Sequence, residues 1–131
     1  MSEEQVPNEL RYTKSHEWVK VEGNRATVGI TDHAQAQLTD IVFVDLPAAG
    51  KAVQKGGSVL VLESVKTVAD VYAPGNGTVA ESNAELKAHP ELINHDPYGK
   101  GWLYRVTLSG PISDSDLMTP DQYRAFVASG K

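Results

Sequence analysis

The sequence predicts a mainly β fold, a sandwich or barrel of antiparallel sheets with a few short helices and a helix at the C-terminal end. Short apolar, β-branched stretches recur along the chain, and Gly, Asn and Pro punctuate the intervals between them. Helical patterns occur only between groups of strands and at the end, without the strand–helix alternation of a parallel sheet. The 131 residues fit one domain with one core.

Local signals place each element in order, because turn residues bound strands and capping residues bound helices. In the first half we expect a loose polar lead-in over 1–9, two strands within 11–31 around Glu22-Gly23-Asn24, a helix from a cap at Thr31 or Asp32 to Leu38, a strand over 41–47, and turns at Gly50 and Gly56-Gly57. In the second half we expect a hairpin over 59–73, a strand within 73–82, a short helix within 83–94 interrupted or ended before Pro90, a strand within 95–109, and a C-terminal helical segment over 113–129 whose second piece starts at Pro120.

Composition argues against several functional classes. The formal net charge is −5 and the pI is near 5.3, which disfavours nucleic-acid binding and favours docking to partners with basic patches. No apolar run is long enough to span a membrane, and the acidic start MSEEQVPNEL resembles neither a secretory signal nor an Arg-rich presequence. We therefore expect a cytoplasmic protein, with a processed organellar protein left open.

The patterns of ordinary catalytic sites do not occur in the sequence. The chain has no cysteine, which removes thiolate nucleophiles, disulfides and Cys-based metal sites. Its histidines follow no metal-ligand spacing, and neither a G-x-x-x-x-G-K-[ST] phosphate loop nor a G-x-S-x-G elbow occurs. We expect no metal site and no catalytic residues in the protein itself.

The stretch VLVLESVKTVADVYAP, residues 59–74, departs from its own local rules. It reads as strand almost throughout, and its length requires a reversal inside it. The reversal falls at Val65-Lys66, although tight turns favour Asn-Gly or Asp-Gly. Pairing outward from this tip puts four apolar side chains on one face and two acids on the other: Leu60, Leu62, Ala69 and Val71 against Glu63 and Asp70.

Lys66 is thereby presented at the end of a stiff two-stranded ribbon. The simpler interpretation is a solvated lysine in a turn, since exposed lysines are common. The breach of turn preference argues for a function, because local rules are most often broken at functional sites. Rigid, β-branched flanks suit a lysine that has to be presented away from the body of the protein.

These residues carry a resemblance to known proteins. The stretch AAGKAVQKGGSVLVLESVKTVADVYAPGNGTV resembles a lipoyl/biotinyl attachment domain, and Val65 and Thr67, in place of the methionines that flank a biotinylated lysine, point to lipoate. YTKSHEWVKVEG, VGITDHAQAQL, PELINHDPYGKGWL and the YRAFVAS tail are similar, in order, to the glycine cleavage system H-protein family. The resemblance covers residues 10–128. Thr39, where the family usually has Gly, and PGNGTVAES are departures that touch turn geometry and surface.

The resemblance implies one lipoyl-carrier domain over 1–131, folded as a flattened barrel-sandwich hybrid of antiparallel sheets. It implies that Lys66 carries lipoate in amide linkage, within an attachment motif that includes Glu63 and Ser64. The protein would be a carrier and not an enzyme. It would take up the aminomethyl group of glycine as CO2 leaves, and deliver this group for transfer to tetrahydrofolate.

The resemblance also implies partners: a pyridoxal-phosphate glycine decarboxylase (P protein), an aminomethyltransferase (T protein), a dihydrolipoamide dehydrogenase (L protein), and a lipoate ligase or lipoyl/octanoyl transferase. Nucleic acid and membranes are not expected as partners. We expect a bacterial, cytoplasmic monomer.

Four further residues are implied to hold the loaded arm: Ser15, Glu17, Asp70 and, as a weaker candidate, His33. The loaded arm ends in an amine on a carbon that water can attack, so a carrier has to pair the ammonium and exclude solvent. The ordinary alternative for Glu17 and Asp70 is a pair of exposed carboxylates.

Three other functions share parts of this pattern. A relay protein would pass the lipoyl group of Lys66 to other proteins, and deleting its gene would strip their modification. A biotin carrier would hold biotin on the same lysine, which streptavidin blotting detects. An enzyme in its own right would show turnover without partners.

Overall fold

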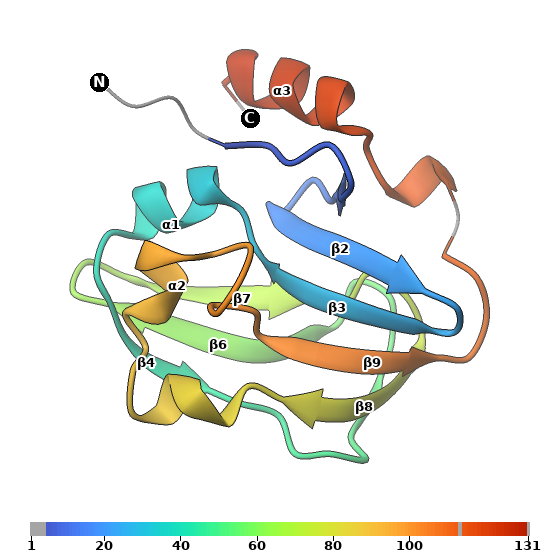
Figure 1. Cartoon of the computed structure of the whole chain (residues 1–131), viewed down its shortest axis with the longest axis horizontal. Coiled ribbons are helices and arrows are strands. Elements are labelled where there is room, and N and C mark those ends of the chain that lie inside the picture. Colours follow the sequence, from blue (N-terminus) through green and yellow to red (C-terminus); the bar gives the residue numbers. More distant parts are fainter. Residues whose placement is uncertain (1–4, 113, 131) are drawn as a thin grey trace.

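The structure is a computed structural model that describes residues 5–112 and 114–130. Antiparallel strands form two sheets that lie against each other, and short helices surround them (Figure 1). The predicted mainly β fold of antiparallel sheets with a C-terminal helix is confirmed.

The larger sheet contains the first hairpin of the chain and the strands that return to it later. In spatial order its six strands are β1 (Arg11–Tyr12), β2 (Glu17–Glu22), β3 (Arg25–Ile30), β9 (Tyr104–Leu108), β8 (Gly77–Ser82) and β5 (Ala52–Val53). Gly23 has a φ of 64° in the turn between β2 and β3, a conformation that glycine adopts at no steric cost. The hairpin predicted around Glu22-Gly23-Asn24 is thus confirmed.

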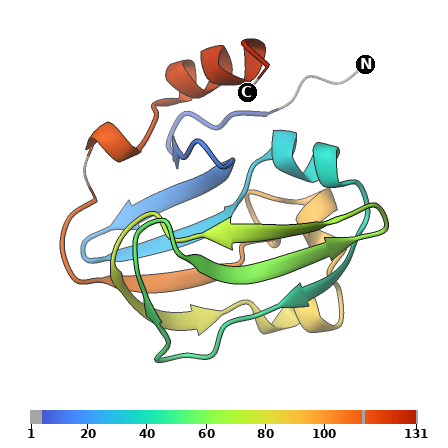
Figure 2. The ribbon, with the colours of Figure 1, turned by 180° about the vertical axis from the view of Figure 1, so that it is seen from behind.

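The smaller sheet carries the lysine. Its three strands are, in spatial order, β4 (Ile41–Asp45), β6 (Ser58–Ser64) and β7 (Val68–Tyr72). Figure 2 shows this sheet in front of the larger one, with the β6–β7 connection projecting to one side. Because β7 pairs with no strand except β6 among the described residues, one edge of β7 is left for other parts of the chain to cover.

The helices predicted to start after a cap at Thr31 and at Pro120 begin there, and the helix expected within 83–94 is interrupted before Pro90. The α-helices are α1 (Asp32–Leu38), α2 (Leu92–His95) and α3 (Pro120–Ala128), and the 3-10 helices are η1 (Ala84–Lys87) and η2 (Asp114–Asp116). Thr31 caps α1 by accepting the N–H of Ala34 at 3.1 Å, and Thr119 with Gln122 forms a capping box before Pro120. No helix within 5–112 or 114–130 is long and apolar enough to span a membrane.

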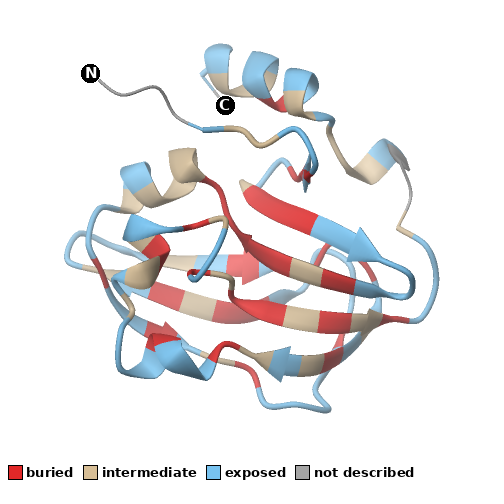
Figure 3. Cartoon of the chain, in the orientation of Figure 1, coloured by how far each residue is buried: buried red, intermediate tan, exposed pale blue. Residues whose placement is uncertain are grey.

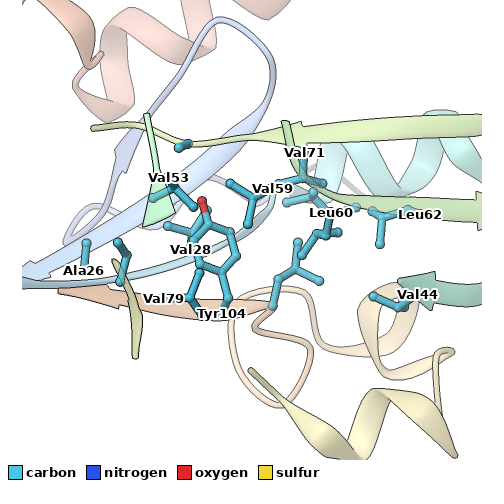
Figure 4. Packing of buried hydrophobic residues seen from close by; sticks show 14 of the residues in the cluster. Ala26, Val28, Val44, Val53, Val59, Leu60, Leu62, Val71, Val79 and Tyr104 are labelled. Carbon is cyan, nitrogen blue, oxygen red and sulfur yellow. The ribbon is translucent and has the colours of Figure 1, made fainter. Parts of the chain in front are cut away.

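The main core lies between the two sheets, where both contribute buried strand faces (Figure 3). Leu60, Leu62 and Val71 come from the hairpin and pack with Val28 and Tyr104 of the larger sheet (Figure 4). Each of these five side chains is at most 2% exposed. The apolar face predicted for the hairpin is therefore the face that anchors it to the rest of the protein.

A second cluster joins both ends of the chain to the larger sheet. The rings of Tyr12 and Tyr123 stack with centroids 4.7 Å apart, so α3 packs against β1. Of the expected lead-in 1–9, residues 5–9 form neither helix nor strand. They are nevertheless attached, since the Gln5 N–H donates to the Asp32 carboxylate at 2.8 Å and the Tyr12 hydroxyl donates to the Pro7 carbonyl at 2.6 Å.

Candidate functional site

The hairpin has the register that pairing from Val65-Lys66 predicts. Glu63 lies opposite Val68, Leu62 opposite Ala69, and Val61 opposite Asp70. Leu62 is fully buried, whereas Glu63 and Asp70 are exposed on the other face. A register shift occurs between Ser58 and Leu60, at the end of β6 that lies away from the tip.

The tip is held by Ser64 and by a neighbouring loop. The Ser64 hydroxyl accepts the backbone N–H groups of Lys66 at 3.2 Å and Thr67 at 3.0 Å, and it donates to the Thr67 carbonyl at 3.1 Å. The N–H of Val65 donates to the carbonyl of Asp40 at 3.0 Å. These bonds satisfy the backbone of a tip that lacks Gly and Asn, so Val65-Lys66 needs no favoured turn residue.

Lys66 is exposed at the end of the ribbon and lies next to α1. Its Nζ is 3.4 Å from the backbone oxygen of Gln37, in the last turn of this helix. Gln37 also lines a cleft that runs between α1 and the hairpin. The ε-amine therefore lies at the rim of the cleft, next to one of its lining residues.

The cleft has a volume of about 440 Å³. One set of lining residues is apolar and another carries hydrogen-bonding or charged groups. The apolar set is Ile30, Ala34, Leu38, Leu62, Ala69, Val71 and Val127, together with Gly130. The polar set is Ser15, His16, Glu17, His33, Gln37 and Asp70. The apolar part suits a hydrocarbon chain, and the carboxylates suit a cation at its end.

Glu17 is the polar residue buried most deeply in this cleft, with 1% of its surface exposed. Its Oε1 accepts the hydroxyls of Ser15, at 2.6 Å, and of Thr13, and its Oε2 accepts the N–H of Tyr72 at 3.2 Å. Burial raises the pKa of Glu17 above its ordinary value of 4.5, while these hydrogen bonds act in the opposite direction. An entering cation would stabilise the ionised form that burial disfavours.

The other residues predicted to hold the arm line the same cleft. Ser15 is bonded to Glu17, and His33 projects from the first turn of α1 with its ring centroid 4.9 Å from that of His16. Asp70 lies on β7, and its Oδ1 accepts the Ser58 hydroxyl at 2.8 Å across the hairpin. All four predicted positions thus come together, although Asp70 is exposed and Glu17 is buried.

No motif in the sequence singled out His16, or the part that α3 plays, in this cleft. His16 Nδ1 lies 2.8 Å from the hydroxyl of Tyr123, and Val127 and Gly130 bring the end of α3 to the cleft. The nearest signal in the sequence was the YRAFVAS tail, which contains Tyr123 and Val127. Nothing local in that tail indicates a partner 107 residues away.

Comparison with known proteins identifies the family. The family model described as glycine cleavage H-protein matches residues 10–130 of this chain. The chain belongs to the glycine cleavage H-protein family. The H protein of Rubrobacter xylanophilus is 51% identical over 119 residues, which cover 91% of this chain and 92% of that protein. The H protein of Staphylococcus haemolyticus is 50% identical, with 93% of this chain and 97% of the relative covered.

A solved structure extends the likeness to three dimensions. The crystal structure of the glycine cleavage system H protein from Mycobacterium marinum matches with a TM-score of 0.85 and 37% identity, over 96% of this chain and 100% of that one. Membership makes the chain the lipoyl-carrying component of the glycine cleavage system and not an enzyme itself. It works with other components of that system.

Proposed function

We propose that Lys66 is the residue that carries the lipoyl group, in amide linkage, and that Glu63 and Ser64 complete the motif read by the modifying enzyme. Three observations support this assignment. Lys66 is exposed at the end of a projecting ribbon, Ser64 fixes the backbone around it, and its Nζ lies at the rim of the cleft. When bound, the lipoyl group supplies a dithiolane that takes up and returns the aminomethyl unit of glycine.

The cleft is proposed to receive the loaded arm. Its apolar wall, with Ile30 and Leu38, excludes water from the carbon that bears the amine. Glu17 accepts a hydrogen bond from the ammonium, and Ser15 keeps the Glu17 carboxylate in place. Asp70 and His33 complete the polar rim. The single observation that carries this proposal is the buried carboxylate of Glu17 inside a cleft that opens beside Lys66.

The arm serves several partners in turn. We propose a pyridoxal-phosphate glycine decarboxylase, an aminomethyltransferase and a dihydrolipoamide dehydrogenase, together with a lipoate ligase or lipoyl/octanoyl transferase that modifies Lys66. A net charge of −5 favours docking to basic surfaces on these proteins. A tethered arm also gives each active site a high local concentration of cargo. The cytoplasmic location and the monomeric state stay predictions.

Intact-mass measurement tests the attachment site directly. The wild-type chain, incubated with a lipoate ligase, lipoate and ATP, should gain the mass of one lipoyl group. Lys66→Arg should gain nothing, while Lys20→Arg, a change at an exposed lysine of β2, should be modified like the wild type. A lipoyl-sized gain that persists in Lys66→Arg would show that another lysine is the attachment site.

A further inference from the structure

The C-terminal helix contributes to the arm cleft. Val127 and Gly130, at the end of the helical segment, line it together with residues of β2, α1 and β7. Figure 1 shows α3 above β2 and the connection from β3 to α1. Phe126 packs against His16, with ring centroids 5.6 Å apart. A helix more than 50 residues beyond Lys66 in sequence is therefore part of the surface around its arm.

Tyr123 connects this helix to both neighbouring walls. Its ring is fully buried, and its hydroxyl lies 2.7 Å from Thr31 Oγ1 and 2.8 Å from His16 Nδ1. Thr31 caps α1, the helix that brings His33 to the cleft. His16 stands between Ser15 and Glu17 in the opposite wall. One hydroxyl thus contacts the elements that carry three of the residues proposed to hold the arm.

The Tyr123 hydroxyl holds the side chains of His16 and Thr31 in place and contacts neither of their backbones in any bond that the structure describes. The backbones of the two walls are already joined, because the Thr31 N–H donates to the His16 carbonyl at 3.1 Å. His16 has a φ of 68°, a left-handed backbone conformation that residues other than glycine rarely adopt. In this conformation its ring packs against the rings of His33 and Tyr123. The contact from Nδ1 to the Tyr123 hydroxyl is one of the contacts that hold the imidazole in this orientation.

We propose that α3 is a third wall of the arm cleft and that Tyr123 is a positioning residue, whose hydroxyl holds His16 and the start of α1 in the shape that shields the cargo from water. This inference rests on the proposed function, because it takes the cleft to be the place where the loaded arm lies. Tyr123 acts through His16 and Thr31, and it is not among the residues that line the cleft.

The matched pair of variants is Tyr123→Phe and Tyr12→Phe. The two rings stack on each other and both are fully buried, so each change removes one hydroxyl from the same aromatic pair. The Tyr12 hydroxyl bonds the Pro7 carbonyl and is not part of the cleft. Both variants keep the ring packing and should fold.

The main measurement is the lifetime of the loaded arm without any partner enzyme. Water attacks the methylene carbon between sulfur and nitrogen; ammonia leaves, then formaldehyde leaves and the thiol is regenerated, with no net redox change. We expect Tyr123→Phe to release ammonia and formaldehyde about fivefold faster than the wild type, the factor that one lost hydrogen bond implies. Tyr12→Phe should keep the wild-type lifetime.

A second measurement uses the unmodified chain. The ring nitrogen shifts of His16, observed by NMR, should change in Tyr123→Phe and stay the same in Tyr12→Phe, because only the first change removes the contact to Nδ1. Equal acceleration of cargo loss in both variants would overturn the inference, since a general loss of stability would then be the cause. A wild-type lifetime in Tyr123→Phe would overturn it too.

The experiment also separates this inference from the proposed function. The reference is the same aminomethyl group on free dihydrolipoamide. A wild-type chain that protects its cargo no better than this reference would contradict the proposed cleft and the inference together. Protection in the wild type that persists in Tyr123→Phe would contradict only the inference.

Discussion

The buried carboxylate of Glu17 accepts the backbone N–H of Tyr72 through its Oε2 at 3.2 Å. This bond joins β2 of the larger sheet to the edge strand β7 of the hairpin that presents Lys66. The other oxygen of the same carboxylate accepts the hydroxyls of Ser15 and Thr13. One side chain therefore both connects the two sheets beside the cleft and supplies the negative charge inside it.

Replacing Glu17 with Gln should separate these two tasks. Because burial raises its pKa, the folded chain binds the Glu17 proton more tightly than the unfolded chain does. The free energy of unfolding should therefore fall as pH rises from about 4.5 through the higher pKa of the folded state, and Glu17→Gln should lack this part of the fall. Urea unfolding of both proteins between pH 4 and 8 would measure the difference.

The control for this pH effect is Glu22→Gln, at the exposed end of the same strand. It should follow the wild-type pH dependence. The Gln amide at position 17 donates where a carboxylate oxygen accepted, so a constant offset in stability is expected and does not affect the test. A free energy of unfolding for Glu17→Gln that varies with pH in parallel with that of the wild type would contradict the raised pKa of Glu17.

The lipoylated and loaded Glu17→Gln variant should also lose its aminomethyl cargo about tenfold faster than the wild type, because a charged hydrogen bond to the ammonium is gone.

Replacing Ser64 with Ala should loosen the tip while leaving the ribbon in place. The variant loses the acceptor of two backbone N–H groups, Lys66 and Thr67, and we expect their amide hydrogens to exchange faster. The free energy of unfolding should fall by about 1 kcal/mol. Modification by a lipoate ligase should slow, because Lys66 is no longer presented in one conformation. Intact mass over time gives that rate.

Ser58→Ala is the matched control for the tip, since it removes a hydroxyl from the other end of the same strand. That hydroxyl bonds the Asp70 carboxylate and contacts no backbone group of the tip in any bond that the structure describes. Its modification rate should match that of the wild type. A Ser64→Ala chain modified as fast as Ser58→Ala would show that the ligase does not need a fixed tip.

The parts of the site that follow local rules could be predicted from the sequence. Alternation along 59–73 gives the register, since Leu62 has to face the core and a shift by one residue would expose it. The Ser64 hydroxyl reaches only two and three residues along the chain, a contact of the kind that serine often makes. Thr31 as a candidate cap and Pro120 as a helix start were recognisable for the same reason.

Contacts between segments that are distant in the sequence could not be predicted from local patterns. Glu17 lies on a strand where a carboxylate is normally exposed, and its burial depends on β7, more than 50 residues later. Tyr123 and His16 are 107 residues apart in the sequence and come together only in the folded structure. The tip also depends on Asp40, whose carbonyl accepts the Val65 N–H from outside the hairpin. Each contact is set by how the sheets pack, for which no short motif exists.

Thr39 offers a prediction that begins with the sequence. Its φ of 64° and ψ of −151° lie in a region that is populated almost entirely by glycine, at the position where the family usually has Gly. Asn94 holds the loop on both sides of this residue, by donating to the Thr39 carbonyl at 2.7 Å and accepting the Ile41 N–H at 2.9 Å. The conformation is thus imposed on Thr39 by its surroundings.

Thr39→Gly should relieve this strain. Strain of about 1–3 kcal/mol outweighs the extra entropy that glycine loses on folding, about 0.5–1 kcal/mol, so we expect a net stabilisation of about 1 kcal/mol. For a chain of this size that corresponds to a rise in Tm of about 3–5 °C. Thr39→Ala is the control, because it removes the bond from the Thr39 hydroxyl to the Leu38 carbonyl but keeps a side chain at positive φ. If Thr39→Ala raised the Tm as much as Thr39→Gly, the gain would come from losing the threonine side chain and not from relief of backbone strain.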